Sequence, residues 1–293
     1  MGNEAPIHRP VMAREVARFL AAAGTKLLLD ATVGAGGHSL AFLGSDPSTR
    51  IVGIDRDPAM VARARERLLA FGDRATLEVS PYSGLEAVLD ARGLACVDAA
   101  LFDLGASSVH FDEPGRGFSF LAPGPLDMRY DPRGGPTAAD LVNDTPVEDL
   151  AVLLLEHGDE RDAGRIARAI AAERPIRDTL RLADVILRAV PRRGRIHPAT
   201  RTFQALRIAV NGEFAEIEHG LPAALRRLRS GGLLLAISFH SGEDRLVKRI
   251  LRREPLAEPL PECPLGPEAD EVRENPRARS ARLRVARRRE EVR

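Results

Sequence analysis

Short apolar runs alternate with amphipathic segments through the first hundred residues of the chain. Four of these runs have the length of buried strands, namely Leu27–Asp30, Ile51–Asp55, Ala75–Val79 and Val97–Phe102. A helical pattern follows each of the first three runs. Strands that alternate with helices are typical of a parallel sheet covered by helices.

The pattern changes after the fourth predicted strand. Residues Asp112–Gly135 are rich in glycine and proline and predict a long irregular loop, a kind of loop that is usually functional or disordered. From Thr137 to about Arg229 the pattern is helical. Thr145–Glu148 has the spacing of a capping box, and Gly158 suits a helix stop. Further helices are predicted at Asp162–Glu173, Leu180–Ala189, Ala199–Val210 and Glu213–Arg229.

The sheet pattern returns near the C-terminus. Leu233–Phe239 predicts another strand and Glu243–Arg253 a helix, whereas the five prolines of Pro255–Pro267 predict a loop without regular structure. Ala281–Arg287 alternates apolar and charged residues and predicts an edge strand. We therefore expect one doubly wound α/β domain, interrupted by a helical insert.

A glycine-rich turn follows the first predicted strand. Asp30–Gly37 reads Asp-Ala-Thr-Val-Gly-Ala-Gly-Gly, and Asp55 ends the next strand 21 positions after Gly34. Glycines let a ligand approach the backbone at a helix N-terminus, and an acidic residue at that distance can accept the hydroxyls of a ribose. Together the two features predict an adenosine-containing cofactor.

Two cofactor classes fit such a turn. A dinucleotide fingerprint requires glycine or alanine at position 39, where this chain has Ser39, and it normally lacks an acidic residue such as Asp30 at the strand end. The pattern Asp-x-Thr-x-Gly-x-Gly instead resembles the first motif of S-adenosylmethionine-dependent methyltransferases. Asp103 ends the fourth strand and should face the same crevice as Gly36 and Asp55.

Composition restricts the number of domains and the cellular compartment that we expect for the protein. The chain has 293 residues, a length that suggests one large domain with an insertion or two domains, and 43 basic against 42 acidic residues give a net charge of +1. No apolar run approaches the roughly 20 residues of a membrane span, and the N-terminus does not resemble a secretory signal. Cys96 and Cys263 alone supply neither a disulfide framework nor a cysteine-built zinc site. We expect a cytoplasmic protein.

Several long stretches resemble the bacterial RsmH (MraW) methyltransferases, a family that methylates N4 of a cytidine in the decoding centre of 16S ribosomal RNA. They occur in order along nearly the whole chain. The stretches are His8–Val11, Asp30–Ser39, Asp103–Ser108, Arg116–Phe120, Gly124–Arg129, His197–Asn211, Ile237–Arg245 and Asn275–Ser280.

The resemblance implies a Rossmann-like S-adenosylmethionine methyltransferase fold. Its first part would span residues 1–135 with an active-site loop, its helical insert residues 136–207, and its second part residues 208–293 with a basic tail. At two positions the chain departs from the family, with His110 for a usual glutamine and Gly242 for a usual leucine. The implied contacts to S-adenosyl-L-methionine come from Gly36, Gly37, His38, Asp55, Tyr82, Asp103 and His110.

The implied reaction is an in-line methyl transfer to an exocyclic amine, which requires alignment and exclusion of water but no metal. The amine is a poor nucleophile, so an acceptor for its N–H would help. We expect Asp103 with Ser107 or Ser108 to supply it. His240 is expected either at the site or as a structural residue of its strand-to-helix turn. Phe118, Phe120 and Met128 would either wall the base pocket or form a minor core.

Charge resolved along the chain favours an RNA partner. Arg161–Arg207 contains 12 arginines and four acidic residues, a net of +8, and Arg273–Arg293 contains nine arginines and three acidic residues, a net of +6. The remainder therefore carries 1 − 14 = −13. Such polarity is expected of a protein that contacts phosphates on one face, although a solvated surface is the alternative. The predicted RNA-binding residues are Arg195, His197, Arg201, Arg277 and Arg279.

Two other functions remain open from the residues alone. A nicotinamide-dependent oxidoreductase would share the glycine turn, and Ser39 and Asp30 are the features that oppose it. A non-catalytic RNA-binding protein or assembly factor would share the fold, and the presence of Gly36, Asp55 and Asp103 opposes that function. The partner expected from the resemblance is 16S rRNA within a small ribosomal subunit or its precursor. The sequence predicts no oligomeric state.

Overall fold

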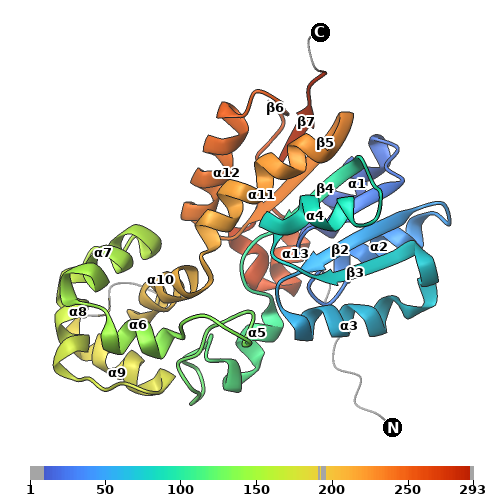
Figure 1. The fold of residues 1–293 in the computed structure, drawn as a ribbon. Helices are drawn as coiled ribbons and strands as arrows, with labels where there is room; N and C mark the ends of the chain where they lie inside the picture. The colour runs from blue at the N-terminus through green and yellow to red at the C-terminus, as the bar shows by residue number, and fades with distance from the viewer. Residues whose placement is uncertain (1–9, 191, 193–195, 291–293) are drawn as a thin grey trace. The chain divides into compact units, whose positions relative to one another are not determined.

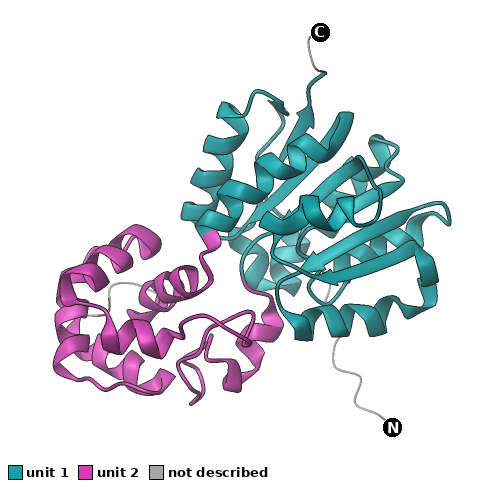
Figure 2. Cartoon of the chain, in the orientation of Figure 1, with its two compact units in different colours: residues 1–105, 214–293 teal, residues 106–213 magenta. Residues whose placement is uncertain are grey.

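The chain forms two compact units, coloured separately in Figure 2. The computed structural model describes residues 10–190, 192 and 196–290. Unit 1 consists of the described residues of 1–105 and 214–293, and unit 2 consists of those of 106–213. The insert expected at residues 136–207 lies within unit 2, which also contains the glycine- and proline-rich loop.

Unit 1 is built around a sheet of the order β3-β2-β1-β4-β5-β7-β6 within the described residues (Figure 1). Strands β1 to β5 are parallel neighbours, and β7 is antiparallel to both β5 and β6. The strands are β1 (Leu27–Asp30), β2 (Arg50–Asp55), β3 (Ala75–Val79), β4 (Val97–Asp103), β5 (Leu228–Ser238), β6 (Ala257–Pro259) and β7 (Arg282–Arg288).

Helices cover both faces of this sheet, as the apolar pattern predicts. One apolar cluster joins the sheet to α1 (Ala13–Ala22), α2 (Gly37–Ser45) and α3 (Pro58–Leu68). A second cluster joins the opposite face to α4 (Leu85–Asp90), α11 (Glu213–Arg227) and α12 (Ser241–Arg253). The remaining short elements are α13 (Ala269–Glu274), η1 (Leu69–Arg74), η2 (Tyr82–Gly84) and η4 (Pro276–Ser280).

Adjacent strand residues explain why the strands read as continuous apolar runs. Leu28 of β1 belongs to the first cluster and Leu29 to the second, since successive side chains point to opposite faces of a sheet. Both faces are covered, so the positions inside β1 and β4 are mostly apolar. Exposed polar residues such as Arg50 of β2 and Arg282 of β7 lie at strand ends, whereas Asp30, at the end of β1, is only 1% exposed.

Unit 2 is helical and has a core of its own. Leu126 and Met128, from the loop, are buried in that core with residues of the helices, and Phe120 packs against it. Phe118 is also only 4% exposed. These side chains therefore pack as a minor core. The helices are α5 (Ser108–Asp112), η3 (Pro114–Arg116), α6 (Ala138–Asp144), α7 (Val147–Gly158), α8 (Ala163–Ala172), α9 (Thr179–Ala189) and α10 (Ala199–Asn211).

Three expectations about local structure are wrong: the edge position of Ala281–Arg287, the lack of regular structure in Pro255–Pro267, and the capping box at Thr145–Glu148. The strand expected at the edge, β7, lies between β5 and β6, because three residues of the proline-rich segment pair with it as β6. The Thr145–Glu148 capping box is absent. Thr145 precedes a proline and is extended, so α7 begins at Val147 with Pro146 as its N-cap.

Among the described residues, no helix is both long and apolar enough to cross a bilayer.

Candidate functional site

The glycine turn after β1 has a backbone that only glycine adopts readily. Gly36 is the N-cap of α2 with φ 80°, and its N–H donates to the Val33 carbonyl at 2.7 Å. A side chain there would also contact Leu68 at 3.4 Å. Beyond Gly36, the N–H groups of the first turn of α2, from Gly37 and His38 onward, have no acceptor within the helix. The turn thus presents backbone donors to a polar ligand.

Asp30 and Ser39, on either side of this turn in the sequence, are joined by a hydrogen bond. The Ser39 hydroxyl donates to Asp30 at 2.6 Å, and both side chains are buried. Burial raises the pKa of Asp30 to about 6, and the Ser39 hydrogen bond limits the rise. The two residues that argued against a dinucleotide fingerprint therefore form one interaction. Sequence analysis did not detect this positioning role of Ser39.

Asp55 ends β2 and holds the other side of the turn. One carboxylate oxygen accepts the Gly34 N–H at 2.9 Å, and the second accepts the Asp57 N–H at 2.9 Å. The spacing of 21 residues between Gly34 and Asp55 therefore corresponds to a direct contact. The side chain is half-buried, and carboxylate oxygens have further lone pairs for a ligand hydroxyl.

Asp103 ends β4 and is anchored through its backbone only. Its N–H donates to the Thr32 hydroxyl at 2.6 Å, so the threonine of the glycine turn fixes the end of β4. Its Oδ1 is buried and has no hydrogen-bond partner among the described residues. Burial, and then the negative charges of Asp30, Glu243 and Glu271, raise the pKa of Asp103 to about 8. An orphaned carboxyl oxygen at a strand end is suited to receive a ligand donor.

His38 lies on α2 with its ring directed to the Asp103 carboxyl. His38 Nε2 is 3.7 Å from Asp103 Oδ2 and has no hydrogen-bond partner. The side chain is 7% exposed, and burial lowers its pKa to about 4, although a bond to the Val11 backbone opposes the shift. The imidazole is therefore neutral at physiological pH.

Tyr82 follows β3 and packs against Phe102 of β4. Its ring makes an edge contact with Phe102, with centroids 5.6 Å apart. Gly220 of α11 approaches the same ring so closely that an added Cβ would lie 2.6 Å from Tyr82. The Ser80 N–H donates to the Asp55 carbonyl, at the end of β2, at 2.9 Å. Tyr82 follows Ser80 by two residues, so it lies close to the end of β2. The expected contact of Tyr82 with an adenine stays a prediction.

The expected site residues of unit 2 form a separate small cluster. Ser107 caps α5, and its N–H donates to His110 Nδ1 at 3.0 Å. The His110 ring is buried, with the Phe118 and Tyr130 rings each 5.0 Å away. Ser108 makes no side-chain hydrogen bond among the described residues. His110 thus has a capping role that the sequence did not predict.

The predicted RNA-binding residues are divided between the units. In unit 2, His197 Nδ1 accepts the Ala199 N–H at 3.1 Å, at the start of α10, and its ring is tilted against Phe120 with centroids 4.8 Å apart. Arg201 is exposed. Arg277 and Arg279 are exposed on η4 of unit 1. Arg195 lies outside the described residues.

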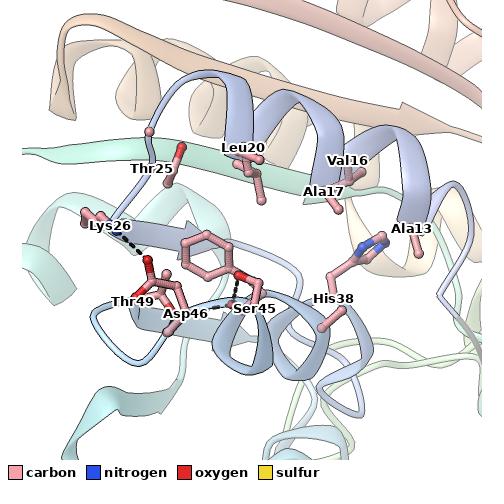
Figure 3. Close-up of a pocket in the computed structure, with 14 residues that line it drawn as sticks. Ala13, Val16, Ala17, Leu20, Thr25, Lys26, His38, Ser45, Asp46 and Thr49 are labelled. Carbon is pink, nitrogen blue, oxygen red and sulfur yellow. Dashed lines mark hydrogen bonds and ion pairs between the residues drawn. The ribbon is translucent and has the colours of Figure 1, made fainter.

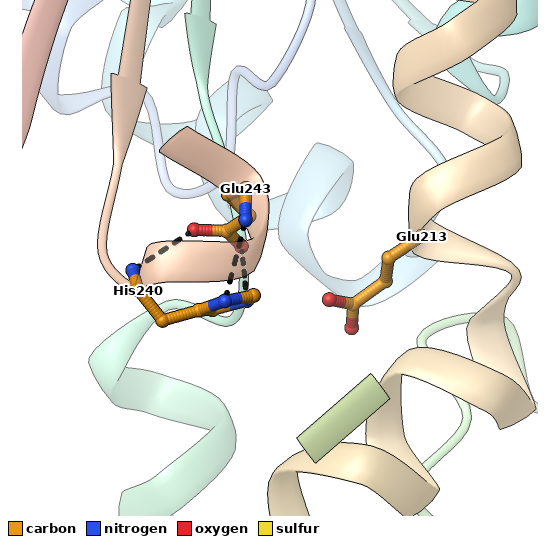
Figure 4. A group of neighbouring side chains, drawn as sticks. All are labelled: Glu213, His240 and Glu243. Carbon is orange, nitrogen blue, oxygen red and sulfur yellow. Dashed lines mark hydrogen bonds and ion pairs between the residues drawn. The ribbon is translucent and has the colours of Figure 1, made fainter. Parts of the chain in front are cut away.

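His240 has a structural role in its strand-to-helix turn, which was one of the two roles predicted for it. It is the N-cap of α12 and forms a capping box with Glu243, drawn in Figure 4, in which the Glu243 N–H donates to His240 Nδ1 and the His240 N–H donates to the Glu243 carboxylate. Glu213, also drawn there, pairs with Arg207 in unit 2. Gly242 leaves room for Phe214, whose ring would lie 2.9 Å from an added Cβ.

A pocket of about 330 Å³ opens between α1 and α2 (Figure 3). Its walls are mainly apolar and include Val16, Leu20 and Phe42, and the His38 side chain extends toward α1 at one end. Residues of α1 and α2 line most of the pocket, and the segment Gly24–Lys26 with Asp46 and Thr49 completes it. The pocket shares His38 with the strand-end group, whereas Asp55 and Asp103 do not line it.

Unit 1 accordingly brings together one group of expected residues at the carboxyl ends of β1, β2 and β4. Thr32, which was missed as a functional residue, links two of these strand ends. Its signal in the sequence was the Asp-x-Thr pattern itself. The group consists of Gly36, Gly37, His38, Asp55 and Asp103, with Tyr82 two residues beyond a backbone contact to Asp55.

The chain is similar to a well-defined set of known proteins. A family model described as the MraW methylase family matches residues 5–289. Ribosomal RNA small subunit methyltransferase H of Sorangium cellulosum is 48% identical over 286 residues, covering 96% of this chain and 90% of the relative. The protein of that name from Thermobifida fusca is 43% identical over 313 residues, covering 98% and 95%. The one from Thermomicrobium roseum is 45% identical over 304 residues, covering 96% and 93%.

Proposed function

Because the chain belongs to the MraW methylase family, we propose that it methylates N4 of a decoding-centre cytidine in 16S ribosomal RNA of the small subunit. The observation that carries the proposal is the Asp103 carboxyl group, whose buried Oδ1 lacks a partner beside a glycine turn. The names of the relatives support the small-subunit rRNA as the substrate. The enzyme acts in the cytoplasm, where that substrate is assembled.

The methyl donor is S-adenosyl-L-methionine, which supplies a methyl group on a positively charged sulfur. The strand-end site fits it, since the turn at Gly36 offers backbone donors and Asp103 offers an unpartnered oxygen. Asp55 accepts the ribose hydroxyls, and Tyr82 faces the adenine. Gly37 and His38 contribute the backbone of the first turn of α2, and His110 completes the set.

The protein's own part in the chemistry is alignment and proton acceptance. The target base must leave its stack to reach a pocket of this kind. Asp103 accepts a hydrogen bond from the cytidine N4 amine and then its proton, which directs the nitrogen lone pair toward the methyl group. Ser107 already caps α5, so Ser108 is the hydroxyl better able to assist.

Contacts to RNA phosphates come from arginines that have no acidic partner. On α9, Arg181 and Arg188 are neutralised by Glu173 and Asp184. On α8, Arg165 and Arg168 are exposed and make no ion pair among the described residues. A free guanidinium can exchange its counterion for a phosphate, whereas a paired one must first lose its partner.

One experiment tests the reaction directly. Small ribosomal subunits that lack the modification are incubated with the protein and S-adenosyl-L-methionine carrying a labelled methyl group. The expected result is one labelled cytidine in the decoding centre, with the label on N4. Label at another nucleotide, or at carbon 5 of the cytosine, would overturn the proposed specificity, and the absence of label would overturn the activity.

A matched pair of variants tests the RNA surface. Arg165→Ala with Arg168→Ala should weaken RNA binding and reduce the slope of log affinity against log salt by about 2. Arg181→Ala with Arg188→Ala removes the same charge from a neighbouring helix and should leave that slope nearly unchanged. Equal effects of the two pairs would show that total charge, and not the unpaired arginines of α8, governs binding.

A further inference from the structure

The closest approach of two unsatisfied side chains in the strand-end site joins His38 and Asp103. His38 Nε2 and Asp103 Oδ2 are 3.7 Å apart, which is longer than a hydrogen bond. Neither Nε2 nor Asp103 Oδ1 has another partner among the described residues. Two buried polar groups left in this state are costly unless they share a proton or receive a ligand.

The tautomer of His38 follows from its other contact. His38 hydrogen-bonds to the Val11 backbone in a way that favours its protonated form, so the ring is the donor and the backbone carbonyl the acceptor. Since Nε2 has no partner, Nδ1 makes this bond. The neutral imidazole therefore carries its hydrogen on Nδ1, and Nε2 turns a lone pair toward Asp103.

The other titratable groups around Asp103 act in the same direction. Asp30 faces it from β1, Glu243 from α12 and Glu271 from α13, and each carries or can carry a negative charge. A lone pair and three acidic groups all disfavour a carboxylate at position 103. A protonated Asp103 cannot accept the proton of an incoming amine, so the cofactor-free site is not yet prepared for the proposed reaction.

We propose that Asp103, beside the Nε2 lone pair of His38, carries a proton in the cofactor-free protein and loses it when the positively charged methyl donor binds. In this step the O–H bond of Asp103 breaks, its electron pair stays on the carboxylate, and the proton passes to solvent. The carboxylate then faces the positively charged sulfur of the methyl donor in addition to its acidic neighbours. His38 is a positioning residue, since it acts on the amine only through Asp103. This inference rests on the proposed function.

The test measures protons by calorimetry. S-Adenosyl-L-methionine and S-adenosylhomocysteine differ by one methyl group and one positive charge. Each is titrated into the full chain at pH 7 in buffers of different ionisation enthalpy, which gives the number of protons released. The methyl donor should release about 0.5–1 proton more than the homocysteine form, as expected for a carboxyl group that is mostly protonated at that pH.

Two variants assign the proton. Asp103→Asn should abolish the difference between the two ligands while Asp30, the other carboxyl with a raised pKa, is still present. His38→Gln replaces the lone pair with an amide that can donate to the carboxylate, so it should at least halve the difference and move the acid limb of the methylation rate to lower pH. The comparison of wild type with Asp103→Asn decides the question even without a folded His38 variant.

The outcomes separate this inference from the proposed function. If both ligands bind and release equal numbers of protons, the proposed loss of the Asp103 proton is wrong while the methyltransferase proposal stands. If Asp103→Asn releases as many protons as wild type, the proton belongs to another group and the inference is again overturned. If neither ligand binds, the proposed function fails and the inference fails with it.

Discussion

The carboxyl ends of β2 and β4 each carry an aspartate, but the two carboxyl groups differ in their hydrogen-bond partners and in the charges near them. Asp55 accepts backbone N–H groups from Gly34 and Asp57, both at 2.9 Å. Asp103 has an orphaned Oδ1, and burial beside acidic groups raises its pKa to about 8. A carboxylate that accepts backbone hydrogen bonds stays ionised and is suited to bind a ligand hydroxyl, whereas a carboxyl group without such partners is suited to exchange a proton.

The sharpest way to break this comparison is to remove the proton acceptor. Asp103→Asn keeps the shape of the side chain and should lower the methylation rate about 100- to 10,000-fold, the usual range for a general base. Affinity for S-adenosylhomocysteine should change by only a few fold. The checks are single-turnover methylation and calorimetry. A rate within tenfold of wild type would mean that Asp103 is a binding residue like Asp55.

The reciprocal change should affect binding more than chemistry. Asp55→Asn removes a charged acceptor of the ribose hydroxyls, and hydrogen bonds to charged groups contribute about 1.5–3 kcal/mol. Affinity for S-adenosylhomocysteine should therefore fall about tenfold to a hundredfold, with the rate at saturation nearly retained. Asp73→Asn, at an exposed position of η1, is the control. A fall in the saturated rate without a fall in affinity would reverse the roles assigned to the two aspartates.

Asp30 offers an intermediate case, because it is buried but hydrogen-bonded. Ser39→Ala removes the 2.6 Å bond and leaves a buried carboxyl group less satisfied, which should cost about 1–3 kcal/mol of unfolding free energy. Ser45→Ala is the matched control on the same helix, since that hydroxyl bonds a backbone carbonyl near the helix end. Equal losses from the two variants would indicate that Asp30 has no special need for Ser39.

The smallest expected effect is on stability against pH. The folded protein keeps the Asp103 proton up to about pH 8, whereas an unfolded aspartate loses it near pH 4. The folded state therefore binds more protons in this window, and this group makes stability fall as pH rises from 4 to 8. His38, whose pKa is lowered to about 4, acts oppositely between pH 4 and 6.5.

Asp103→Asn isolates the Asp103 contribution, since His38 is common to both proteins. The variant should gain stability relative to wild type as pH rises from 5 to 8, by at least about 1.4 kcal/mol, the equivalent of one pKa unit. Urea unfolding of the cofactor-free protein at several pH values measures it. Parallel stability curves for the two proteins would remove the physical basis for distinguishing Asp103 from Asp55.

The sequence predicted the parallel strands and the positions of the strand-end acidic residues, because both depend on local pattern. It did not predict that Ser39 bonds Asp30 or that Thr32 bonds Asp103, since these contacts depend on how the turn folds back on the strands. β6 was missed because three residues with a proline carry no periodicity. Its pairing with β7 is a tertiary contact, and so are the backbone N–H groups that Asp55 accepts and that Asp103 Oδ1 lacks among the described residues.

The order of the strands has a consequence for biosynthesis. In the finished sheet β4 lies between β1 and β5, yet β4 ends at Asp103 and β5 begins at Leu228, 228 − 103 = 125 positions later. At about 5–20 residues per second, the ribosome needs roughly 6–25 s to supply that neighbour. For this interval β4 is an apolar strand with one open edge, a template for aggregation. Because unit 2 has its own apolar core, it can fold during the wait and shorten the loose chain between the two halves of the sheet.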